Sequence, residues 1–266
     1  MIKIHVFNFL KFGKDLGTDK FVKEISKQIR QDKNGFAGYK FEEGFETYLN
    51  NLSQRSSDNF SELKISDKEV KEIVEKNVRS VQNYIKEKEI FVYVFPHSSD
   101  FVIKKMGGIT GRTVWKDTIY IEVFAFENWK EKFSNVMIHE LTHLITGYYG
   151  QFTIGESLIH EGLAENFRES LLGGSEPWTK AISKIEVLKI LKEIKSSMKI
   201  KDFNVYKEIF FGAGKYPNWS GYTIGYILVK DYLKNKYGDK INWREVFEKP
   251  VKDILKEALK IQDNNS

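Results

Sequence analysis

The sequence contains no cysteine, and this absence excludes two kinds of site. Without thiols the chain can form neither a disulfide nor a metal site with thiolate ligands. Any metal site in this protein must therefore be built from histidine and carboxylate side chains. Histidine is scarce as well, with five residues in a chain of 266. Two histidines at a regular spacing are therefore informative.

Proline, long apolar runs and a dominant sign of charge are also lacking. Four prolines leave no proline-rich linker, and no apolar run approaches the length of a membrane span. The N-terminus shows neither a long apolar stretch nor a small-residue cleavage site, so we expect no signal peptide and a cytoplasmic location. The 42 basic and 37 acidic residues are interspersed, whereas a nucleic-acid-binding protein usually concentrates its basic residues on one face. We therefore expect no nucleic-acid partner and no membrane span.

The lysine-rich stretch 179–201 carries isoleucine and leucine at helical spacing. One interpretation is a helix that lies on a membrane surface. The other is an ordinary amphipathic helix with a solvated lysine face. We favour the second interpretation, because charged helical faces are usually solvated.

The composition, with 41% apolar and 14% aromatic residues, supports a substantial core. We expect residues 1–60 to form an N-terminal helical and polar segment that ends in the loop-like stretch 51–59. Residues 61–266 then form the main domain. Ser66 and Glu69 have the spacing of a capping box and predict the start of a helix that continues to about residue 88.

A strand region is predicted after this helix. The β-branched and aromatic stretch 89–96 ends at a proline, which is typical of a strand. Over 118–125, aliphatic side chains at 119, 121 and 123 alternate with Tyr120, Glu122 and Phe124, which indicates a second strand. We expect the FVIKK stretch, 101–105, to belong to the same strand region. His97 follows the first strand as a loop residue, and we assign it no role.

The stretch VMIHELTHLITGYYG places two histidines four residues apart. Apolar residues at three- and four-residue spacing predict a helix here that ends near Gly147. On a helix, His139 and His143 share one face, and Glu140 flanks the point at which they converge. This is the H-E-x-x-H pattern, which supplies two zinc ligands and a general base. The alternative is two ordinary histidines on an amphipathic helix.

A catalytic zinc site needs a third protein ligand and one open position. Residues 155–174 predict a second helix that ends at two glycines. Glu161 and Glu165 lie four apart on it. One carboxylate can complete the zinc site, and the other can accept a hydrogen bond from a ligand histidine. His160 competes as third ligand, but on a helix it points about 100° away from Glu161, so both cannot face the metal.

Residues 218–233 predict a further helix, with Tyr222 and Tyr226 one turn apart. A phenol can donate a hydrogen bond to the oxyanion of a tetrahedral intermediate. The alternative is that both rings serve only aromatic packing. Of the two we prefer Tyr222 as the donor, because the small Gly221 before it leaves room for a substrate and because it begins the helix.

HELTH followed by EGLAE resembles the gluzincin metallopeptidases. The EGLA and GYTIGY segments are most similar to a family of uncharacterised bacterial proteins described as predicted zinc-dependent proteases, especially its members from bacilli. The resemblance covers about residues 90–235, and the first 60 residues add nothing specific to it.

The resemblance implies that His139, His143 and Glu161 bind the zinc and that Glu140 is the base. It also implies that Glu165 accepts a hydrogen bond from the ring nitrogen of a ligand histidine that does not bind the metal. Residues 144–160, which separate His143 from Glu161, form a slightly shorter spacer than in the well-known gluzincins. The alternative therefore stays open that Glu165 is the zinc ligand and Glu161 the supporting carboxylate.

By the same resemblance, the strand at 118–125 forms the edge of the cleft and pairs with the substrate backbone. A plain core strand is the alternative, because a strand pattern does not reveal the position of the strand in its sheet.

We therefore predict an α+β fold in which a small mixed sheet packs on a mainly helical half, zincin-like, with H-E-x-x-H on the active-site helix. The predicted function is a zinc-dependent peptidase with one Zn²⁺ per chain and a peptide or protein as substrate. One alternative is a metal-dependent hydrolase of a non-peptide amide or ester. The other is a zinc-binding protein of the same fold without catalysis.

Overall fold

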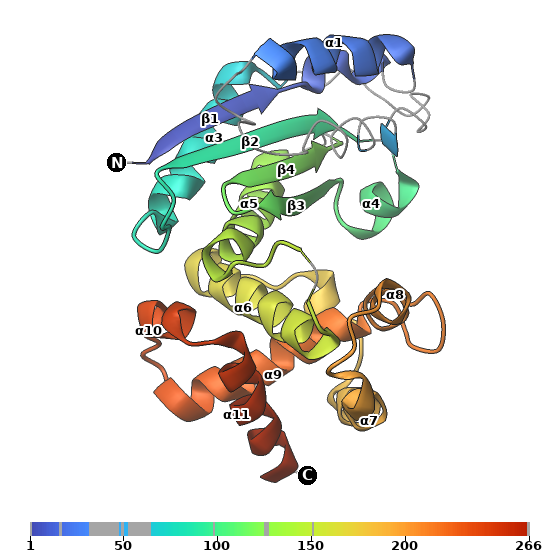
Figure 1. The fold of residues 1–266 in the computed structure, drawn as a ribbon, viewed down its shortest axis with the longest axis vertical. Coiled ribbons are helices and arrows are strands. Elements are labelled where there is room, and N and C mark those ends of the chain that lie inside the picture. Colours follow the sequence, from blue (N-terminus) through green and yellow to red (C-terminus); the bar gives the residue numbers. More distant parts are fainter. Residues whose placement is uncertain are drawn as a thin grey trace. The chain divides into compact units, whose positions relative to one another are not determined.

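The computed structural model describes residues 2–15, 18–31, 48, 51–52, 65–97, 99–124, 128–150 and 152–264 (Figure 1). The chain divides into two compact units. The sheet unit comprises Met1–Gln82 and Glu87–Met137, and the helical unit comprises Asn83–Lys86 and Ile138–Ser266. The stretch 53–59 and the expected boundary at residue 60 lie outside the described residues, and that boundary stays a prediction.

The sheet unit is built around a sheet of four strands in the order β1-β2-β4-β3 (Figure 1). The strands are β1 (Lys3–Asn8), β2 (Glu89–Pro96), β3 (Ile109–Trp115) and β4 (Thr118–Val123). β2 runs parallel to both β1 and β4, whereas β3 runs antiparallel to β4. The sheet is therefore small and mixed, as predicted.

The strand predicted at 89–96 is confirmed as β2. All of its residues after Glu89 are buried, because β2 has a neighbouring strand on each side and is covered on both faces. A near-continuous apolar run is typical of such a strand. β1 was not predicted, although Ile2, Ile4 and Val6 alternate with Lys3 and His5 there; the alternation covers too few residues to stand out within the mixed, polar stretch 1–60.

The position of β4 differs from the one that the resemblance implied. β4 pairs with β2 on one side and with β3 on the other, so β1 and β3 form the two edges of the described sheet. The part of the predicted strand that the structure describes as β4, Thr118–Val123, is therefore a core strand. The FVIKK stretch is not a strand either, because residues Asp100–Lys105 form the short helix α4. A short apolar run fits helix and strand alike, and Ser99 and Asp100 before it favour the start of a helix.

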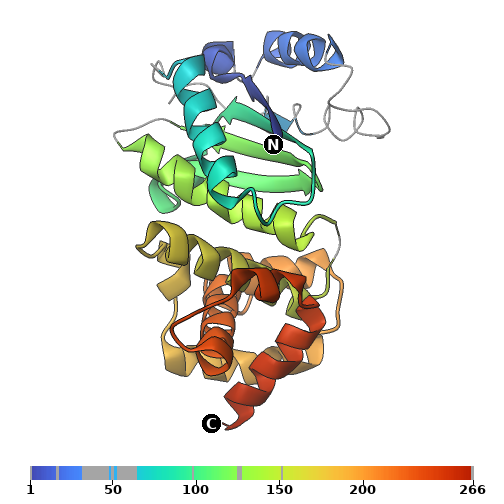
Figure 2. The same ribbon diagram turned by 90° about the vertical axis from the view of Figure 1, so that its left-hand side faces the viewer.

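The described helices of the sheet unit are η1 (Leu10–Asp15), α1 (Asp19–Gln31), α3 (Asp67–Val81), α4 and the first half of α5 (Trp129–Thr146). The predicted capping box is present, with Ser66 accepting from the amide of Glu69 and Glu69 accepting from the amide of Ser66. α3 ends at Val81, earlier than predicted. Figure 2 shows α3 and the first half of α5 in front of the same face of the sheet.

His97 has contacts that the sequence did not indicate. It directly follows β2 and is 2% exposed, and its Nδ1 is paired with the carboxylate of Glu122 on β4. The other oxygen of that carboxylate accepts a hydrogen bond from the hydroxyl of Tyr48 at 2.7 Å. His97 is therefore a buried, paired residue at the carboxyl end of β2.

The helical unit holds the second half of α5 and the helices that follow it. These are α6 (Ile154–Leu172), η2 (Pro177–Lys180), α7 (Lys184–Ile194), η3 (Lys195–Ser197), α8 (Phe203–Phe211), α9 (Ser220–Tyr237), α10 (Trp243–Glu248) and α11 (Val251–Asn264). No helix in the described ranges is both long enough and apolar enough to cross a bilayer.

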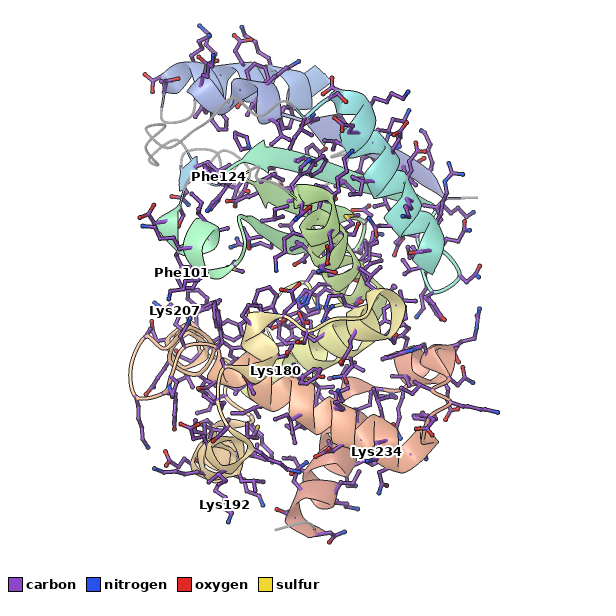
Figure 3. All side chains as sticks on the ribbon, turned by 180° about the vertical axis from the view of Figure 1, so that it is seen from behind. Phe101, Phe124, Lys180, Lys192, Lys207 and Lys234 are labelled. Carbon is purple, nitrogen blue, oxygen red and sulfur yellow. The ribbon has the colours of Figure 1, made fainter. Side chains whose placement is uncertain are left out.

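The lysine-rich stretch forms no single helix but is divided among η2, α7 and η3. Val187, Ile190, Leu191 and Ile194 of α7 are buried. The lysines of α7 are exposed, and Figure 3 shows Lys192 at the periphery of the helical unit. α7 is therefore an amphipathic helix with a lysine face turned away from its core.

α6 and α9 approach so closely that their backbones touch. A Cβ atom on Gly162 would lie 2.2 Å from the carbonyl oxygen of Gly225, and one on Gly225 would lie 2.2 Å from the carbonyl oxygen of Leu158. Asn166 bridges the crossing, because its amide donates to the carbonyls of Gly162 at 2.8 Å and Tyr226 at 3.0 Å. Only glycine fits at either position without separating the helices.

We expect Gly225→Ala to destabilise the protein by about 1–3 kcal/mol, the usual cost of forcing an extra methyl group into a packed interior. The control is Asn235→Ala at an exposed position of the same helix, where alanine improves helix propensity without a clash. Urea unfolding of the three proteins measures both effects. A Gly225→Ala protein as stable as the wild type would contradict the close contact.

Candidate metal centre

The second half of α5 presents the two histidines of the motif on one side of the helix. Their rings are one turn apart, with centroids 4.5 Å from each other and planes at 89°. The helix ends at Thr146, and Gly147 adopts a positive φ of 75° directly after it. The predicted end of the helix near Gly147 is confirmed. His139 and His143 therefore present their Nε2 atoms to a common region.

α6 supplies the carboxylates. Thr153 caps its start through a capping box with Glu156. From Ile154 to Arg168 every residue except Glu156 is buried, so α6 is enclosed on all sides. Charged residues on such a helix must be paired. Glu161 is 4% exposed and Glu165 is fully buried.

The carboxylate of Glu161 lies between the two histidines. Its Oε2 is 3.1 Å from Nε2 of His139 and 3.4 Å from Nε2 of His143. Tetrahedral ligands at 2.0–2.2 Å from a zinc ion are about 3.3 Å from one another. Both separations from the Glu161 oxygen match this spacing, and the three side chains are of the types found in a His₂Glu zinc site, so the residues fit the metal.

Glu165 contacts His139 at the other ring nitrogen, on the opposite side of the imidazole from Glu161. Its Oε1 is 2.7 Å from Nδ1 of His139 and 2.7 Å from Nε1 of Trp178. Its Oε2 accepts from Nε of Arg168 at 3.1 Å. A carboxylate on the far nitrogen of a ligand histidine fixes the tautomer and the orientation of the ring.

Glu140 belongs to the same group of donor atoms. One of its carboxylate oxygens lies within 4.8 Å of one nitrogen from each of the two histidines, and its side chain is buried. A group of His139, Glu140 and His143 alone can also hold a metal ion. Glu161 is the other candidate for the third ligand, and its oxygen lies within 3.4 Å of an Nε2 atom of each histidine.

The electrostatics of the cluster favour a positive charge at the point where these groups meet. Burial lowers the pKa of His139, but its hydrogen bonds to Glu161 and Glu165 outweigh burial, and the pKa lies well above its usual value. Burial raises the pKa of Glu161, yet the nearby His143 and His139 bring it down to about 2. Either a proton on His139 or a metal cation can supply the charge that these buried carboxylates require.

His143 is held differently from His139. Its Nδ1 is buried and has no hydrogen-bond partner within the described part of the chain. Its Nε2 faces Glu161. His143 is thus oriented by the group at its front, whereas His139 is held from the front and from behind.

His160, the competing third ligand, makes its contacts with residues outside this group. Its Nδ1 is 3.0 Å from the hydroxyl of Thr146, and its ring stacks on Tyr148 at 4.5 Å. Burial and the nearby His143 lower the pKa of His160 to about 3. Its contacts are those of a neutral packing residue.

The two candidate tyrosines differ in their surroundings. The phenol of Tyr226 donates to Glu169 at 2.6 Å and contacts Lys230. For Tyr222, burial raises the pKa well above its usual value, and the charges of Glu161 and Glu140 raise it further. The charges of the candidate site therefore act on the phenol of Tyr222, whereas the phenol of Tyr226 is hydrogen-bonded to Glu169.

Four further residues near the site carried no predicted role. Arg168 and Trp178 contact Glu165, and Tyr148 packs against His143 with ring centroids 4.8 Å apart. Burial raises the pKa of Tyr206 well above its usual value, and the nearby Tyr222 and Tyr148 raise it further. A signal was available only for Arg168, which lies three residues after Glu165 and thus on the same side of the helix.

The fold and the site together define a mixed α/β protein with a candidate metal centre of two histidines and a glutamate. The family described as "Predicted Zn-dependent protease (DUF2268)" matches residues 70–256. This match spans more than half of the chain, and the protein therefore belongs to that family. No curated protein and no solved structure matches the chain significantly.

We expect Glu161→Gln to weaken zinc binding more than Glu165→Gln, because a ligand is lost in the first variant and only its support in the second. The loss of a supporting group typically costs about 10- to 100-fold in affinity. Competition with a calibrated chelator measures both constants. Glu169→Gln, two turns beyond Glu161 on the same helix, should bind zinc as the wild type does. A larger loss in Glu165→Gln would exchange the two roles.

Proposed function

We propose that this protein is a zinc-dependent peptidase of the gluzincin type, with a zincin-like arrangement of H-E-x-x-H on α5 and the glutamate ligand on α6. The observation that carries the proposal is the position of the Glu161 oxygen, 3.1 and 3.4 Å from the two Nε2 atoms. Membership in a family of predicted zinc-dependent proteases supports it.

His139, His143 and Glu161 would hold one Zn²⁺ per chain. When bound, zinc acidifies a water molecule and polarises the carbonyl group of the scissile bond. Two neutral imidazoles and one carboxylate leave a single positive charge on such a centre. Glu165 keeps His139 in the tautomer that offers Nε2.

Glu140 is the proposed general base. It accepts a proton from the attacking water as the new carbon–oxygen bond forms at the carbonyl carbon. It then delivers that proton to the leaving amine as the carbon–nitrogen bond breaks. The burial of Glu140 beside the two histidines keeps its carboxylate within reach of both partners in this transfer.

Tyr222 is the proposed donor to the oxyanion. Negative charge develops on the carbonyl oxygen only during the reaction, so a fixed phenol stabilises the transition state more than the bound substrate. The influence of Glu161 and Glu140 on its pKa supports this role. The phenol of Tyr226 is already engaged by Glu169.

We expect Glu140→Gln to abolish hydrolysis of a mixed peptide pool while zinc binding and fold are kept. The amide is nearly isosteric with the carboxylate but cannot accept the proton. Glu131→Gln, at an exposed position of the same helix, should cleave as the wild type does. Undiminished turnover by a zinc-loaded Glu140→Gln protein would refute the assignment of the base.

Comparison of the peptide pool with a set of acyl esters tests the substrate class in the same assay. Chelator-sensitive cleavage of peptides supports a peptidase. Chelator-sensitive cleavage of esters alone would instead identify a metal-dependent hydrolase of another bond.

We expect Tyr222→Phe to lower kcat by about 10²- to 10³-fold, the usual cost of removing one oxyanion donor. KM and zinc content should change little, because the hydroxyl acts in the transition state. Tyr226→Phe is the matched control one turn further along α9. Full kcat in Tyr222→Phe would make that phenol a packing residue, and a defect confined to Tyr226→Phe would place the donor there.

A further inference from the structure

Glu165 is held by two donors that approach its carboxylate from different segments. Nε1 of Trp178 donates to Oε1 at 2.7 Å, and Nε of Arg168 donates to Oε2 at 3.1 Å. The Oε1 atom that accepts from Trp178 also accepts from Nδ1 of His139 at 2.7 Å. The orientation of the His139 ring therefore depends on where this one oxygen is fixed.

The position of Trp178 is itself fixed by α9. The hydroxyl of Thr223 donates to the carbonyl of Trp178 at 2.7 Å and accepts from the amide of Ala181 at 3.2 Å. A single threonine thus holds the backbone at Trp178 and just beyond the end of η2. Trp178 is 8% exposed, and its ring packs edge-on against Trp219. The indole N–H is consequently a preorganised donor.

Arg168 anchors the other oxygen of the carboxylate. It is 1% exposed, and its remaining nitrogens donate to the carbonyls of Gly173 at 2.9 Å and Gly174 at 3.4 Å. Because these contacts tie the guanidinium to the end of α6, Arg168 also has a structural task. Its replacement would disturb the helix end as well as Glu165, so Trp178 offers the cleaner test.

Support from behind is concentrated on one of the two histidines. His139 has Glu165 at its far nitrogen, whereas Nδ1 of His143 is buried without a hydrogen-bond partner among the described residues. The path from Thr223 through Trp178 and Glu165 to His139 is therefore the means by which the surrounding helices fix the ligand geometry.

We propose that Trp178 is a positioning residue of the metal centre, whose indole N–H holds Glu165 where it orients His139 for the metal. This inference rests on the proposed function for the identity of the metal. The competing interpretation is that Trp178 only fills the core. The two interpretations differ in what happens to zinc affinity when the N–H is removed but an aromatic ring is kept.

Zinc affinity of Trp178→Phe, measured on the full chain by chelator competition, gives the first readout. We expect a loss of about 10-fold, at the lower end of the range for a group that supports a metal ligand. Trp243→Phe is the matched control, because Trp243 is also 8% exposed and packs on Phe167 of α6. It should lose stability but keep its zinc affinity.

The indole N–H resonance gives a second readout that a packing role would not move. In ¹⁵N-labelled protein the resonance of Trp178 is identified by its loss in Trp178→Phe. We expect this resonance to shift when zinc is added, because the acceptor oxygen is shared with the ligand His139. The resonance of Trp243, identified in the same way, should stay in place.

A double-mutant cycle tests whether Trp178 acts through Glu165. If it does, Trp178→Phe and Glu165→Gln affect the same hydrogen bond, and the loss of zinc affinity in the double variant is smaller than the product of the two single losses. Losses that multiply independently would contradict this path.

None of these measurements requires turnover. A protein that cleaves no peptide but shows all three effects would refute the proposed peptidase and leave the role of Trp178 intact. Unchanged zinc affinity in Trp178→Phe, or an indole resonance that does not respond to zinc, would overturn the inference even in an active peptidase. A wild-type protein that binds no zinc would overturn it as well.

Discussion

A carboxylate that leaves water must find positive charge or hydrogen-bond donors inside the protein, and α6 buries two of them on successive turns. Glu161 and Glu165 both meet His139, one at each nitrogen of its ring. This double contact determines the rest of the site. It fixes the rotation of α6 against the end of α5, orients the first histidine, and leaves one carboxylate oxygen facing both Nε2 atoms.

The packing of the helical unit keeps this arrangement rigid. α6 and α9 meet at two glycines with their backbones in contact, and Gly162 of that pair directly follows Glu161. The same α9 carries Tyr222 near the site and Thr223, which holds Trp178. The candidate ligand Glu161, its neighbour Glu165 and the candidate oxyanion donor Tyr222 thus all lie on the two helices of this crossing. This rigidity would favour metal binding, because it holds the ligand side chains in the required positions before the metal binds.

The features that the sequence predicts well are those with a local physical cause. The helical period, the capping box at Ser66 and Glu69, and the glycine after α5 mark element types and ends that the structure confirms. The convergence of His139, His143 and Glu161 could be expected as well, because zinc chemistry restricts ligand type and number. The spacing of four residues then places the candidates on single faces.

The remaining features of the fold and the site depend on tertiary packing, which produces no periodic pattern in the sequence. The order of strands placed β4 inside the sheet, and the pattern of alternating residues is the same for an edge strand. The FVIKK stretch is too short for its period to separate helix from strand. Trp178 stands alone after a proline, with no spacing that links it to Glu165, although the two are in direct contact. Such contacts between distant segments become visible only when the helices are in place.

The central claim is that His139, His143 and Glu161 form a zinc site, and metal content per chain tests it most directly. Elemental analysis of the full chain, loaded with zinc and freed of excess metal, should give one zinc per wild-type chain. The His143→Ala protein, prepared in the same way and shown to be folded, should have lost most of that metal. Full zinc occupancy in His143→Ala, or no zinc in the wild type, would contradict the account.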